Sequence, residues 1–210
     1  MNTYRGVREP LILLLSLYLL SLLLSFDFVD FVMKDSYREL LEGDVRRRYE
    51  EKIVDIGKDP YEIEKKDFTK DKKFWPHVNS VDLFDFLILR KSFYSSDQLR
   101  SYKALEAYRL FQDGWIKEIL HMELNSCHLL KAKVNHSMRI REKPLEPWII
   151  ISSGGINSAH CTCMAGLGEA CSHISAVLFA VEAWTKVRKE ASVTDVPAYW
   201  MMPSSVQVLI

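Results

Sequence analysis

Cysteine and histidine are concentrated in the C-terminal third of this chain, and this cluster constrains the fold more than any other feature. Three of the four cysteines lie between positions 161 and 171, and a histidine follows the last of them by two positions. Thiolate and imidazole are the ligands that zinc selects, and structural zinc is usually held by four of them in a tetrahedron. The spacing therefore predicts one zinc site, whose ligands are Cys161, Cys163, Cys171 and His173.

The sequence before the first ligand pair predicts a β-hairpin. Residues 148–152 are aromatic and β-branched, and a Gly-Gly pair follows, after which residues 156–163 are expected to return as a second strand. Residues i and i+2 of a strand face the same side, so Cys161 and Cys163 can reach one ion. A disulfide framework is the weaker interpretation, because three clustered thiols are odd in number and cysteines at i and i+2 bridge poorly.

A glycine loop and a helix are expected to supply the second ligand pair. Gly166 and Gly168 are expected to let the loop turn back with positive φ, and residues 173–187 carry apolar side chains at helical spacing. Cys171 and His173 would then lie at the first turn of this helix. Four protein ligands leave no open coordination position, so we expect a structural zinc ion and no enzymatic activity.

This ligand pattern, together with the predicted ββα order, resembles the SWIM-type zinc finger. The flanking sequence is similar to the animal subgroup of that family at residues 101–108, 124–134 and 144–148, and the resemblance covers roughly residues 35 to 203. In that subgroup the finger often precedes a phage-recombinase-type exonuclease domain, which we expect to be absent here. The resemblance implies zinc binding and interaction with DNA or protein.

The whole chain is expected to be an α+β protein in which helices precede the zinc finger. The helical region would cover residues 34–122, including a charged, mobile linker at 58–73 and a helix from a capping box at 95–98 to about residue 121. A short apolar helix at 81–93 and the helix after the capping box are expected to pack on the zinc module. The alternative is a helix-turn-helix that enters a DNA groove. The finger would cover 126–188, followed by a tail at 189–210.

An apolar segment near the N-terminus leaves three interpretations open. Residues 11–26 carry no charge, so residues 1–33 are expected to be a membrane anchor, a signal peptide or an artefact of the gene model. If the segment spans a membrane, the basic residues at 34–48 keep the zinc module in the cytoplasm. Zinc thiolates require a reducing compartment, so the nucleus or cytoplasm is expected otherwise.

The charge balance argues against a protein that coats nucleic acid over its whole surface. Lys+Arg and Asp+Glu both number 28, and proteins dedicated to nucleic acid are usually basic. A local basic strip is expected either to contact phosphate or to be a solvated face of a small sheet. The strip consists of Lys131, Lys133, Arg139, Arg141 and Lys143.

The alternative function is a membrane-tethered protein–protein adaptor without nucleic-acid contact.

Overall fold

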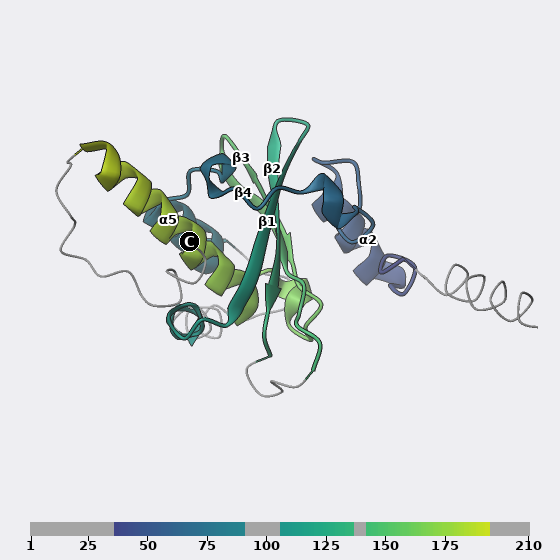
Figure 1. The fold of residues 1–210 in the computed structure, drawn as a ribbon. Coiled ribbons are helices and arrows are strands. Elements are labelled where there is room, and N and C mark those ends of the chain that lie inside the picture. The colour runs from purple at the N-terminus through teal and green to yellow at the C-terminus, as the bar shows by residue number, and fades with distance from the viewer. Residues whose placement is uncertain (1–35, 91–105, 137–141, 194–210) are drawn as a thin grey trace, which may run out of the picture. The chain divides into compact units, whose positions relative to one another are not determined.

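The computed structural model describes residues 36–90, 106–136 and 142–193 (Figure 1). The apolar segment, the capping box at 95–98 and the tail beyond residue 193 lie outside the described residues. The chain divides into two compact units, Met1–Glu42 and Gly43–Ile210. The described part of the first unit, residues 36–42, forms turns. No helix in the described ranges is long and apolar enough to cross a membrane.

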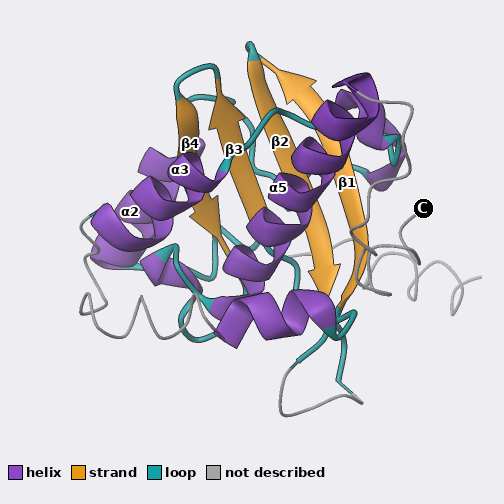
Figure 2. Ribbon diagram, turned by 90° about the vertical axis from the view of Figure 1, so that its left-hand side faces the viewer, coloured by secondary structure: helices purple, strands orange, loops and turns teal. Residues whose placement is uncertain are grey.

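A four-stranded antiparallel sheet forms the centre of the second unit (Figure 2). Each strand pairs with the next along the chain, in the order β1-β2-β3-β4. The turn between the first two strands, Asn125-Ser126, has positive φ at both residues, as the tight hairpin turns that match strand twist require. The strands are β1 (Ile116–Leu124), β2 (Cys127–Val134), β3 (Trp148–Ser152) and β4 (Gly155–His160).

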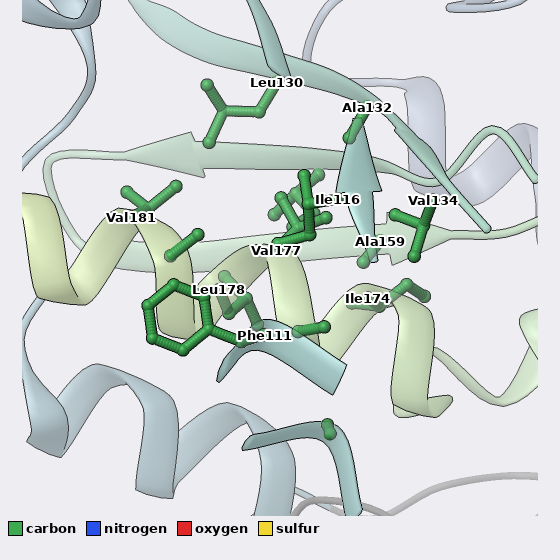
Figure 3. Packing of buried hydrophobic residues seen from close by; sticks show 14 of the residues in the cluster. Phe111, Ile116, Leu130, Ala132, Val134, Ala159, Ile174, Val177, Leu178 and Val181 are labelled. Atoms are coloured by element: carbon green, nitrogen blue, oxygen red, sulfur yellow. The ribbon is translucent and has the colours of Figure 1, made fainter. Parts of the chain in front are cut away.

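Helices cover one face of the sheet through a continuous apolar core. The long helix α5 (Ser172–Val193) presents Ile174, Val177 and Val181 to the sheet, and these side chains are fully buried (Figure 3). The same core includes Leu83 of the short helix α3 (Ser80–Phe84), which is followed by the π-helical turn η3 (Asp85–Leu89). The facing residues of β2 are Leu130, Ala132 and Val134.

The helix α2 (Gly43–Ile53) covers the opposite face. The ring of Tyr49 packs against Trp148 at 6.0 Å, and Ser158 Oγ donates to Lys52 O at 2.7 Å. Trp148 and Ile149 are both fully buried although neighbouring strand residues point to opposite faces. The uninterrupted apolar run of β3 is therefore explained by helices on both sides of the sheet (Figure 1).

The charged segment at 58–73, which we expected to be a mobile linker, packs along the sheet. Thr69 and His121 exchange two backbone hydrogen bonds of 2.8 Å, which adds a bridge to the outer edge of β1. Tyr61 Oη donates to Glu146 O at 2.9 Å. Two 3-10 turns, η1 (Lys65–Asp67) and η2 (Lys72–Phe74), shape this segment. Its charges are carried mainly by exposed side chains, so a high charge did not indicate mobility.

Both helices and strands are present as expected, but the order of helices up to residue 122 followed by ββα is not confirmed. The described helix at 106–112 is followed by a turn at Gly114, and β1 begins two residues after that glycine. Gly114 has φ 72°, Gly114 N–H donates to Phe111 O, and Trp115 N–H donates to Leu110 O. This arrangement is a Schellman motif, which ends a helix at a left-handed glycine. Ile119, which keeps the helical spacing of apolar side chains, therefore lies in β1 and not in this helix.

Candidate metal centre

The four predicted ligands converge where β4 meets α5. Cys161 follows β4 directly, Cys163 lies in the next turn, Cys171 immediately precedes α5, and His173 is in its first turn. Their donor atoms all lie within 4.8 Å of one another. Sulfurs bound to zinc at about 2.3 Å are separated by roughly 3.8 Å in a tetrahedron, so closing around an ion requires only small movements. The prediction that these residues form one cluster able to hold a metal ion is confirmed.

The donor set fits a zinc-type ion. Cys161, Cys171 and His173 are buried, whereas Cys163 is partly exposed. Neither ring nitrogen of His173 has a hydrogen-bond partner among the described residues, although both nitrogens are buried. A buried polar atom without a partner costs free energy, and a metal ion at the sulfurs would satisfy one nitrogen. All three cysteines are free thiols, so no disulfide competes for them.

Burial and mutual hydrogen bonding set the protonation of the three thiols. Burial raises the pKa of Cys161 well above its usual value and that of Cys171 to about 12. Hydrogen bonds from Cys161 and Cys171 lower the pKa of Cys163. A metal ion needs thiolates, so its binding displaces protons and its affinity decreases as the pH falls.

The glycine loop is shaped by close packing rather than by the positive φ that we expected at Gly166 and Gly168. The loop contains the 3-10 turn η4 (Gly166–Gly168), and a Cβ added to Gly166 would lie 1.7 Å from the carbonyl oxygen of Cys161. The left-handed residue is instead Glu169, with φ 63°. Gly166 is therefore required because the backbone that carries the first ligand pair passes directly beside it.

Sequence reasoning missed three charged residues that hold this loop. Glu169 Oε1 lies 3.2 Å from Lys52 Nζ and 3.1 Å from a guanidinium nitrogen of Arg48, both on α2. Lys52 Nζ also donates to Leu167 O at 3.0 Å. No signal in the local sequence indicates these contacts, because Arg48 and Lys52 lie more than one hundred positions before their partners.

The basic strip does not form an open surface in the described residues. The side chain of Lys131 is only 15% exposed, and its ammonium donates to Pro60 O at 3.0 Å and lies over the Tyr61 ring. Burial lowers the pKa of Lys131. Lys133 is half-buried opposite Glu118 of β1, whereas Lys143 is exposed. Residues 60–61 cover the Lys131 ammonium, and its role as a phosphate contact stays a prediction. Arg139 and Arg141 lie outside the described residues.

Comparison of the chain with models of protein families, with curated proteins and with solved structures found no match. The resemblance to the SWIM-type finger stays a prediction from the ligand spacing and the flanking residues. Cys127, the cysteine outside the cluster, is buried at the start of β2.

Proposed function

We propose that this chain is a zinc-binding module of SWIM type, in which a structural zinc ion supports a surface that binds protein or nucleic acid. The observation that carries the proposal is the convergence of three thiols and an unpartnered imidazole within 4.8 Å. Zinc favours this mixture of sulfur and nitrogen, whereas harder cations prefer oxygen. The ion would join the end of β4 to the start of α5.

The same four ligands support a structural rather than a catalytic role. Catalytic zinc usually keeps one position for water or substrate, and a Cys₃His set fills a tetrahedron with protein atoms. We therefore propose a binding module and not an enzyme. The requirement for reduced thiols favours the cytoplasm or nucleus.

An exposed apolar face supports a protein partner. Val81 and Phe84 lie three residues apart on α3, with exposed fractions of 74% and 54%. Residues at this spacing share one helix face, and exposed apolar side chains are typical of protein-binding surfaces. The membrane-tethered adaptor is the variant of this proposal in which residues 11–26 act as an anchor.

Nucleic acid is the second candidate partner, and it depends on the exposed end of the basic strip. The side chain of Lys143 is 85% exposed, and Arg139 and Arg141 are its sequence neighbours. If these residues bind phosphate, affinity for a DNA fragment falls steeply with salt, and Lys143→Ala reduces the slope by about one unit. Absence of binding to DNA at low salt would exclude nucleic acid and leave a protein as the proposed partner.

The metal content of the purified full chain tests the proposed function. We expect one equivalent of zinc in the wild type and in Cys127→Ala, because Cys127 lies outside the ligand cluster. Cys163→Ser and His173→Ala should each lose stoichiometric zinc, since each removes one of four ligands. A full equivalent of tightly held zinc in both ligand variants contradicts the assignment.

A further inference from the structure

A buried lysine on α2 reaches the metal loop from a distant part of the sequence. The side chain of Lys52 is 1% exposed, and its ammonium binds the carbonyl of Leu167 and the carboxylate of Glu169. Arg48, one helical turn earlier, binds the same carboxylate at 3.1 Å. The loop between the second and third metal ligands is thus attached to a helix more than one hundred residues earlier in the chain.

Glu169 connects the contacts with α2 to the metal ligands. It lies two residues before Cys171, and its left-handed backbone, with φ 63°, is unusual for a residue with a long side chain. Two cations on one carboxylate supply a reason for that conformation to persist. The direction of the chain entering Cys171 is therefore fixed by contacts made outside the cluster.

The charges of α2 complement those of a loaded metal centre. A zinc ion with three thiolates and a neutral imidazole carries a net charge of −1, and the buried ammonium of Lys52 supplies a positive charge at the ligand loop. Burying a net charge is unfavourable unless an opposite charge lies nearby. The Lys52 ammonium lies 3.0 Å from Leu167 O, on the loop between Cys163 and Cys171.

We propose that Lys52 is a positioning residue of the metal centre, which orients the ligand loop through Glu169 and balances the charge of the zinc thiolates. The inference rests on the proposed function, since it requires a bound ion. Helix α2 then belongs to the metal-binding unit, which begins well before the hairpin. Metal binding and the docking of α2 stabilise each other, because coupling between two sites is reciprocal.

The zinc affinity of the full chain, measured by competition with a chelator, tests the positioning role. Lys52→Met keeps the length of the side chain and removes the charge, and we expect it to weaken zinc binding about 10- to 100-fold, as loss of outer-sphere partners does. Arg47→Met is the matched control, because Arg47 is on the same helix, is 72% exposed and pairs with Asp44. Unchanged affinity in Lys52→Met overturns the proposal.

A cobalt-loaded sample separates a positioning role from simple loosening of the fold. Removing a cation near the sulfurs raises the energy of their lone pairs, so the thiolate-to-cobalt charge-transfer band of Lys52→Met should move to lower energy at full occupancy. Lys52→Arg retains the charge and should keep the wild-type band position. A band that loses intensity without moving shows a structural effect alone and contradicts the proposal.

Further readouts distinguish this inference from the proposed function. Amide hydrogen exchange of residues 43–53 should slow when zinc is added to the wild type, and unchanged exchange contradicts the coupling. Should Lys52→Met fail to fold, Arg48→Met tests the same carboxylate from a more exposed position, and unchanged zinc affinity there overturns the proposal. A wild-type chain that binds no zinc refutes the proposed function itself.

Discussion

Single residues can be important because of the space that they leave free or because of the polar groups that they bury. Gly166 leaves room for the carbonyl of Cys161, and the imidazole of His173 has no hydrogen-bond partner among the described residues. Elsewhere, His121 of β1 is buried and its Nε2 lies 2.9 Å from Nδ1 of His128. Each of these details is specific enough to predict the result of a substitution.

Replacing Gly166 with alanine should disturb both the loop and the metal ligands. The new Cβ would lie 1.7 Å from the Cys161 carbonyl oxygen, so the backbone must move. We expect a loss of at least about 2 kcal/mol in the free energy of unfolding, together with weaker zinc binding. Gly154→Ala is the control, because its Cβ would meet only the Ser152 hydroxyl at 3.8 Å. Denaturant unfolding of the two zinc-loaded variants measures their stability, and equal free energies of unfolding contradict the packing argument.

The stability of the fold should depend on pH through His121. Burial, assisted by the neighbouring His128, lowers the pKa of His121 from 6.5 to about 4. Between these values the unfolded chain binds a proton that the folded chain does not, so stability is complete above pH 6.5 and decreases as the pH falls towards 4. The slope for this group is at most about 1.4 kcal/mol per pH unit.

A pH series of unfolding free energies for His121→Gln and wild type measures this contribution. The variant should show a shallower decrease between pH 6.5 and 4. Parallel curves for wild type and His121→Gln would show that this histidine does not titrate as described.

At the scale of elements, segments are held by contacts that cross long stretches of sequence. Residues 58–73 pack on the sheet through Thr69 and through the contact of Lys131 with Pro60. The ligand loop is attached to α2 in the same way. Such contacts determine where a charged segment or a buried lysine resides, and a local sequence pattern does not contain them.

Substitution by alanine should change the stability of the fold more at Lys131 than at Lys143, although both residues belong to the basic strip. The Lys131 ammonium is largely buried on a carbonyl and an aromatic ring, so Lys131→Ala is expected to cost about 1–3 kcal/mol of unfolding free energy. Lys143 is 85% exposed, and its substitution should change stability by less than about 0.5 kcal/mol. Thermal unfolding of the two variants measures the difference, and equal effects contradict the assigned packing of residues 60–61.

Across the whole molecule, the sequence predicted the metal cluster well because its ligands and its hairpin are local. The spacing of Cys161, Cys163, Cys171 and His173 is sufficient to identify the group, and strand propensity identified β3. The strand β1 was wrongly expected to be helical, because Trp115 and Ile119 continue a helical spacing beyond the glycine that ends the helix. The role of Lys52 could not be predicted, because its partners are more than one hundred positions away.

X-ray absorption at the zinc edge of the purified full chain measures the ligands of the ion itself. We expect three sulfur atoms at about 2.3 Å and one nitrogen at about 2.0–2.1 Å around each zinc ion. A first shell made of oxygen and nitrogen atoms, or a chain that takes up no zinc under reducing conditions, would contradict it.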